Sequence, residues 1–160
     1  MASHPNEEHT AQMIIACGNP LHGDAGLAWH AARRLEKEPL EGPVHIETHH
    51  QLLADMALPL SRCRIAVFLS ATRGGKAGAV LSRSLQPHTR DVPPGSPWDP
   101  ESLLAYTRAV HGHCPRAYEV SIAGTAFGFG DRLSYPVSQV LPQMVDRVRL
   151  LLAAAPAVAV

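Results

Sequence analysis

The sequence predicts an α/β fold in which a mostly parallel β-sheet lies between helical layers. Short apolar runs that end at turn residues alternate along the chain with longer segments of helical periodicity. The run over 64–69 (RIAVFL) is apolar without interruption, which is typical of a central strand that is covered on both faces. No internal repeat is visible, and strands that alternate with helices are joined by crossover connections.

The other strands are predicted from their apolar or alternating character. Residues 12–17 (QMIIAC) form an apolar run that stops at a Gly-Asn-Pro turn, and residues 43–48 (PVHIET) alternate apolar with polar side chains. A glycine-rich turn precedes residues 79–85, which we expect nearer to an edge of the sheet. Residues 116–123 (RAYEVSIA) alternate as well, and they are the last predicted strand.

Two helices are predicted in the first half of the chain. Residues 24–38 carry apolar side chains at helical spacing, and Asp24 is suited to cap the exposed amides at the start of this helix. Residues 50–60 resemble a short helix that ends near a proline.

Two further helices and a long loop follow. Residues 86–100 contain five prolines and form a loop, in which Trp98 either anchors a partner or covers the edge of the core. Asp99 is expected to cap a helix over 100–110, with Leu103, Leu104 and Val110 as its buried candidates. A helix over 136–155 should close the fold by packing on the sheet.

Length and composition favour one domain and exclude several classes of protein. The 160 residues fit a single domain over 12–155 after a disordered tail over 1–11. Lys plus Arg and Asp plus Glu number 14 each, so nothing in the net charge favours a nucleic-acid partner. No apolar run approaches the ~20 residues of a membrane span, and the polar N-terminus has no signal-peptide pattern. We therefore expect a cytoplasmic protein whose three cysteines are reduced thiols.

Ligands of such folds bind at the carboxyl ends of the strands, so the loops that begin at Gly18, Thr48, Ser70 and Gly124 are the informative ones. The loop over 18–26 (GNPLHGDAG) leads from a strand into a helix, as phosphate-binding loops do. It lacks the Lys and Ser or Thr of such a loop, and a carboxylate stands there instead. Ser70 lies outside any Gly-x-Ser-x-Gly turn, which argues against a serine hydrolase.

The order of several segments resembles the hydrogenase maturation endopeptidases. The most specific element is a Gly-Asn-x-Leu-x-x-Asp turn, and the resemblance covers about residues 12–152. The turn is matched at Gly18, Asn19, Leu21 and Asp24. Four later segments follow in the family's order: HHQLLADMALPLS, FLSATRGGKAG, SPWDPESLLAYTRAVHG and GTAFGFGDRLS.

This resemblance implies a three-layer α/β/α fold around a twisted five-stranded sheet. It also implies a peptidase that removes a C-terminal peptide from the large-subunit precursor of nickel–iron hydrogenase after nickel insertion. The nickel is carried by the substrate, so no cofactor of the protein's own is expected. In the family two acidic residues and one histidine recognise this nickel, and such donors suit a divalent metal.

The sequence departs from the family at all three of these positions. Alignment by the resemblance places Ala25 and Ser70 at the acidic positions and Ser96 at the histidine position. A methyl group cannot coordinate a cation, and neutral hydroxyls bind divalent metals more weakly than carboxylate or imidazole. The resemblance therefore predicts a degenerate member that binds the hydrogenase precursor without metal-directed cleavage.

Two alternatives stay open at this stage. The first is an active endopeptidase with a displaced site, which is built from His22 and Asp24 together with His49, His50 or His88. Asn19 is interpreted first as a turn residue and only second as a substrate contact. The second is a small-molecule binding α/β protein that uses the same pocket. A purely structural role for these residues argues against a displaced site. In that interpretation Asp24 caps a helix, and the histidines are surface or hydrogen-bonding groups.

Overall fold

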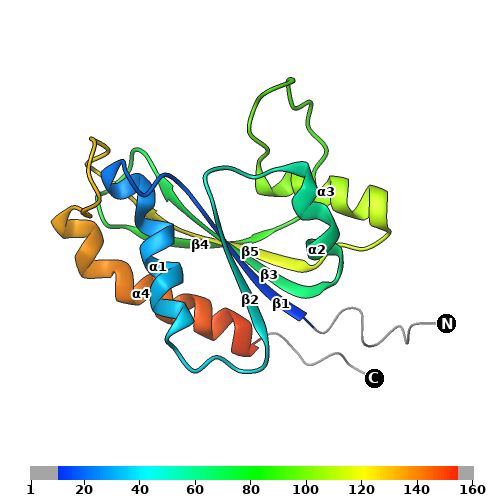
Figure 1. The fold of residues 1–160 in the computed structure, drawn as a ribbon, viewed down its shortest axis with the longest axis horizontal. Helices are drawn as coiled ribbons and strands as arrows, with labels where there is room; N and C mark the ends of the chain where they lie inside the picture. Colours follow the sequence, from blue (N-terminus) through cyan, green and yellow to red (C-terminus); the bar gives the residue numbers. More distant parts are fainter. Residues whose placement is uncertain (1–10, 155–160) are drawn as a thin grey trace.

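The computed structural model describes residues 11–154, and Figure 1 shows their arrangement. Eleven helices and strands follow one another in these residues. In chain order they are β1 (Ala11–Cys17), η1 (Gly23–Gly26), α1 (Leu27–Glu36), β2 (Val44–His49), η2 (Ala54–Met56), α2 (Ala57–Ser61), β3 (Cys63–Thr72), β4 (Val80–Leu85), α3 (Pro100–His111), β5 (Arg116–Ala123) and α4 (Tyr135–Ala154). The expected tail over 1–11 lies outside the described residues except for Ala11, which belongs to β1. Ala155, the last residue of the expected domain, lies outside them too.

The five strands form one sheet in the order β2-β1-β3-β5-β4. Neighbouring strands run parallel except β4, which pairs antiparallel with β5 at one edge. The predicted fold class and the edge position of residues 79–85 are therefore confirmed. Because β1, β3 and β5 are parallel neighbours, their carboxyl ends lie side by side, at the left of Figure 1.

Helices cover both faces of the sheet, as predicted (Figure 1). The helices α1 and α4 lie on one face, where Ile14, Val67 and Val120 of the sheet pack against them. On the opposite face α2 and α3 cover Met13, Ile15 and Phe68. The strands β1 and β3 are buried on both faces, which explains why their sequences read as continuous apolar runs.

The boundaries of three predicted helices are correct to within a few residues. The helix predicted over 50–60 is wrong in its first part, because residues 50–53 are not helical and the short helix α2 follows the turn η2. Asp99 does cap α3, since its carboxylate accepts a hydrogen bond of 2.7 Å from the Ser102 amide. Val110, expected in the core, is 54% exposed because it lies on the outer side of the last turn of α3. The helix expected from Asp24 begins as the single 3-10 turn η1, and α1 proper starts at Leu27.

Within residues 11–154 no helix is both long enough and apolar enough to span a bilayer.

Candidate functional site at the carboxyl ends of the strands

Two loops from distant parts of the sequence are joined at the carboxyl end of the sheet. The turn after β1 (18–26) and the loop after β5 (124–134) exchange three backbone hydrogen bonds. They are Asp24 N to Ala126 O at 2.8 Å, Gly23 N to Gly130 O at 2.9 Å, and Gly130 N to Leu21 O at 2.7 Å. The first and the last segment of the resemblance therefore form one structural unit.

Asp24 holds this unit together from the inside. Its side chain is fully buried, and its carboxylate accepts four hydrogen bonds. The donors are the Thr125 amide (2.9 Å), the Ala126 amide (3.0 Å), the Ser134 amide (2.8 Å) and the Ser134 hydroxyl (2.7 Å). Charged hydrogen bonds of this kind are the stronger ones in proteins, so Asp24 fixes residues 124–134 in place.

The expectation that Asp24 caps the following helix is therefore wrong. No side chain caps η1, and the residue that precedes α1 is Gly26. Residues 23–26 turn once as a 3-10 helix before α1 begins, and this turn directs the Asp24 carboxylate toward the loop after β5. Ser134, the main partner of Asp24, was not predicted, because it lies 110 residues away in the sequence.

The same hydrogen bonds hold the pKa of Asp24 below its ordinary value of 3.8. Burial by itself opposes ionisation, but the bonds from Thr125, Ala126 and Ser134 outweigh it. A carboxyl with a lowered pKa stabilises the fold fully above its pKa in the unfolded chain, and this contribution is lost as the pH falls through the folded pKa. We expect the free energy of unfolding to decline below about pH 4.

Urea denaturation at pH values from 7 to 3 measures this decline. The variant Asp24→Asn, which cannot ionise, should be less stable at pH 7 and should lose less stability on acidification. An equally steep decline in wild type and variant would show that Asp24 does not contribute to it.

The remaining residues of the turn serve its geometry. The Asn19 side chain accepts a hydrogen bond of 2.9 Å from the Leu21 amide, as a turn residue does. Gly18 has a φ of +149°, and a Cβ atom there would lie 1.9 Å from the Ala25 carbonyl oxygen. The close approach of the Gly18 backbone to the Ala25 carbonyl therefore requires glycine at position 18.

The histidines proposed for a displaced site each have a different neighbour. The His22 ring lies edge-on to Phe129, and the His50 ring lies edge-on to Trp29. The His49 ring bonds to the Glu47 carboxylate at 2.9 Å, and His88 lies exposed in the loop before α3. Within residues 11–154, no three His, Cys, Asp or Glu side chains are grouped so that they could hold one metal ion.

A pocket of about 350 Å³ lies at the same end of the sheet, on the face that α3 covers. Ser70 lines it from β3, and Pro97 and Trp98 line it from the loop that contains Ser96. The turn η1, which contains Ala25, lies against β3. The structure thus brings the segments of Ala25, Ser70 and Ser96 to the same end of the sheet.

Most of this pocket is apolar. Its walls include Leu52, Phe68, Leu69 and Trp98, and Trp98 also packs against Tyr106 with ring centroids 5.2 Å apart. Burial raises the pKa of Cys17, which also lines the pocket, to about 12. This thiol therefore stays protonated near neutral pH and is not an activated nucleophile.

One carboxylate that the sequence analysis did not single out also lines the pocket. Glu119 projects from β5, and its carboxylate accepts a bond of 3.0 Å from Arg83, which also donates to Glu101 at 2.6 Å. Because Glu119 alternates with the buried Val120, the sequence indicates which face of β5 Glu119 occupies. Its partner Arg83 lies next to it only through the pairing register of β4 with β5. Arg83 thus bridges the two carboxylates, of which only Glu119 lines the pocket.

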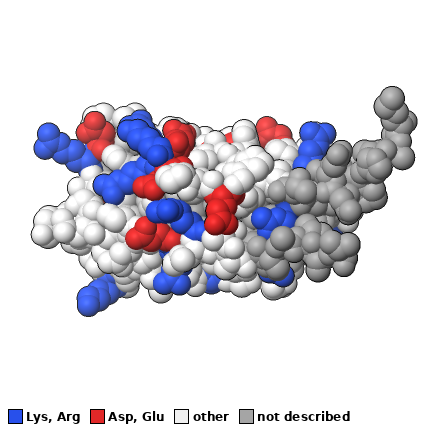
Figure 2. Space-filling view, turned by 90° about the horizontal axis from the view of Figure 1, so that it is seen from below, with Lys and Arg blue, Asp and Glu red and all other residues white. Residues whose placement is uncertain are grey.

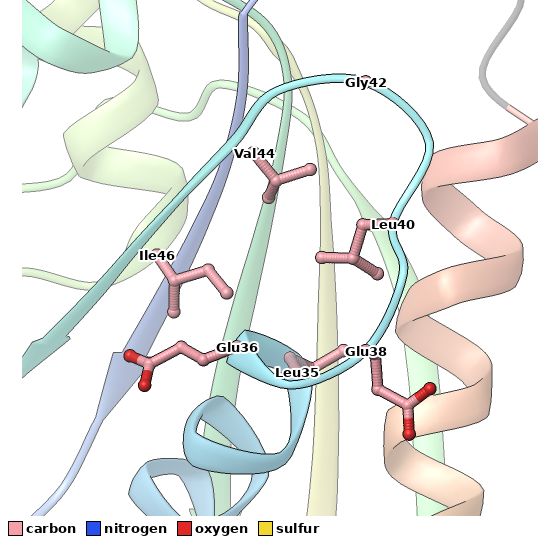
Figure 3. A pocket seen from close by; sticks show the side chains of 7 residues that line it. All are labelled: Leu35, Glu36, Glu38, Leu40, Gly42, Val44 and Ile46. Carbon is pink, nitrogen blue, oxygen red and sulfur yellow. The ribbon is translucent and has the colours of Figure 1, made fainter.

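A separate hollow lies at the other end of the sheet, where the chain passes from α1 to β2. Figure 3 shows the apolar side chains of Leu40, Val44 and Ile46 around this hollow, whereas the carboxylates of Glu36 and Glu38 point away from it. The three apolar residues pack against the core, so they serve the packing of the fold. This hollow therefore lacks the features of a binding site.

Several solved structures of hydrogenase maturation proteases have a similar fold. The hydrogenase maturating endopeptidase HybD from E. coli superposes with a TM-score of 0.73 at 15% identity, over 90% of this chain and 93% of that one. The hydrogenase 2 maturation peptidase from Thaumarchaeota archaeon SCGC_AB-539-E09 gives 0.68 at 18% identity, over 92% and 100%. The NiFe hydrogenase maturation protease HycI from Thermococcus kodakarensis KOD1 gives 0.69 at 16% identity, over 90% and 93%. No protein-family profile and no curated protein matches the sequence.

The chain therefore has the three-layer α/β fold of the hydrogenase maturation proteases, as its motifs indicated. At these sequence identities the likeness shows the fold alone. The superpositions cover nearly the whole of this chain and of each compared chain.

Proposed function

We propose that this protein binds the large-subunit precursor of a nickel–iron hydrogenase and leaves its C-terminal peptide uncleaved. The proposal rests on the fold shared with maturation proteases together with the residues at the three metal-recognition positions of that family. Ala25, Ser70 and Ser96 offer a methyl group and two neutral hydroxyls where carboxylate and imidazole would be needed. The same proposal places the protein in the cytoplasm.

The surroundings of Ser70 are the single observation that supports this proposal most. The pocket that Ser70 lines is mostly apolar, and its one carboxylate, Glu119, is bonded to Arg83. Such walls suit apolar segments of a polypeptide. His50 lines the pocket as well, but within residues 11–154 no three His, Cys, Asp or Glu side chains are grouped to hold a metal that would polarise a peptide carbonyl.

Incubation with a purified, nickel-loaded precursor that retains its C-terminal extension tests the proposal. We expect a complex on gel filtration and an unchanged precursor mass after incubation. The triple variant Ala25→Glu, Ser70→Asp, Ser96→His serves as a matched control for the three positions, since it restores the donor types of the family. Removal of the peptide by the wild-type chain would refute the proposal and favour the displaced endopeptidase site.

The structure offers little support for that displaced site. Asp24 is fully buried, and its carboxylate already accepts four hydrogen bonds, so a metal would have to displace donors that hold the loop after β5. His22 is exposed on the outside of the same turn.

The size of the pocket favours a second candidate function, the binding of a small molecule. A volume of about 350 Å³ lies in the ordinary range of ligand sites, and the aromatic ring of Trp98 provides a contact surface. Retention of a compound by the protein through purification, seen in native mass spectra and lost on Phe68→Trp, would favour this function over precursor binding.

A further inference from the structure

The joined loops present exposed apolar side chains at the carboxyl end of the sheet. Phe129 is 86% exposed and Leu21 is 53% exposed. They belong to one surface, because the Leu21 carbonyl accepts the Gly130 amide and the His22 ring lies edge-on to Phe129 at 6.2 Å. We call the residues Leu21, His22 and Phe129 the loop-tip surface.

The loop-tip surface is held firmly despite its exposure. The Asp24 carboxylate fixes residues 125, 126 and 134, and Gly130 is bonded through its amide and its carbonyl to the turn after β1. Phe129 therefore lies between two fixed points of its loop. An exposed aromatic side chain on a fixed backbone loses little conformational entropy on binding, which is the property of an interface anchor.

The charges next to this surface are mostly positive. Arg132 follows Phe129 closely in the same loop, and the Arg73 guanidinium lies 3.9 Å above the Phe127 ring. Lys76 lies in the turn before β4, and that turn approaches the start of α4 at Pro136. Asp131 is the one exposed acid of residues 18–26, 73–79 and 124–134, which carry the three cations Arg73, Lys76 and Arg132, in a chain whose total charge is zero. Figure 2 shows basic side chains that project at two places from this left-hand end of the molecule.

We infer that the loop-tip surface is a docking site for an acidic protein surface with an apolar pocket, into which Phe129 inserts while Arg73, Lys76 and Arg132 pair with carboxylates around that pocket. The inference rests on the proposed function, because it assigns this docking site to the hydrogenase large-subunit precursor. The joined loops lie at the same end of the sheet as the pocket that Ser70 lines.

Interferometry with the immobilised precursor, at 50 and 300 mM salt, tests the inference. Phe129→Ala should weaken binding by about tenfold or more, mainly through faster dissociation. Leu150→Ala is the matched control, because Leu150 is 65% exposed on α4 and lies outside the loop-tip surface. It should change the affinity less than twofold.

The role of the positive charges is tested with the variant Arg132→Glu. The variant Arg147→Glu is its control, because Arg147 lies on the exposed side of α4. Arg132→Glu should slow association severalfold at 50 mM salt and reduce the dependence on salt, whereas Arg147→Glu should change association less. Thermal melting of each variant verifies that the fold is kept.

The outcomes separate the two claims. If the wild-type chain binds the precursor but Phe129→Ala and Leu150→Ala bind equally well, the docking site is wrong and the proposed function stands. If Arg132→Glu and Arg147→Glu slow association equally, the acidic partner surface is wrong. If the folded wild-type chain does not bind the precursor at all, the proposed function and the docking site are both refuted.

Discussion

Replacing Asp24 by alanine should lower the free energy of unfolding by about 3–5 kcal/mol. The substitution removes a buried carboxylate and leaves three amides and one hydroxyl without their acceptor. Each buried donor left without a partner costs about 1–3 kcal/mol, and entry of water into the space recovers part of this. Urea denaturation at pH 7 measures the change.

Asp131→Ala is the matched control, since Asp131 lies exposed in the loop after β5 that Asp24 anchors. It should change the stability by less than about 0.5 kcal/mol. If Asp24→Ala were as stable as Asp131→Ala, the carboxylate would not hold the two loops together. Loss of binding or activity in Asp24→Ala cannot by itself identify a metal ligand, because the loop after β5 loses its anchor in the same variant.

Replacing Gly18 by alanine should destabilise the protein by about 2–5 kcal/mol. The new Cβ would lie 1.9 Å from the Ala25 carbonyl oxygen, and the φ of +149° is rarely adopted by residues with a side chain. The contact atom belongs to the backbone of η1, so relief would require the turn after β1 to move. The hydrogen bond from the Asn19 amide to the Ala25 carbonyl would be disturbed as well.

Gly128→Ala is the control for this substitution. A Cβ atom at Gly128 meets nothing within 4 Å, and Gly128 lies in the loop that the turn contacts. We expect it to melt within a few degrees of wild type, whereas Gly18→Ala should melt much lower. Equal melting temperatures would mean that the turn accommodates a side chain at position 18.

The strands and helices could be predicted from the sequence because local patterns specify them. The apolar run over 64–69 and the cap at Asp99 depend on neighbouring residues, and the structure confirms both. The exposure of Val110 could not be predicted in the same way, since helical spacing does not reveal where the last turn of α3 leaves the core.

The site depends on contacts between distant residues, so less of it could be predicted from the sequence. Asp24 was singled out, but an aspartate before a helix has the same local pattern whether it caps the helix or binds a loop 110 residues away. Glu119 was missed for a similar reason, because its partner Arg83 is set by the register of β4 on β5. The exposure of Phe129 depends on how the loop after β5 is anchored.

The most direct test of the central claim compares affinity for the same precursor with and without nickel. We predict equal dissociation constants for the nickel-loaded and the metal-free precursor, because Ala25, Ser70 and Ser96 place neither carboxylate nor imidazole at the three metal-recognition positions. An affinity that rises tenfold or more when nickel is present would contradict it.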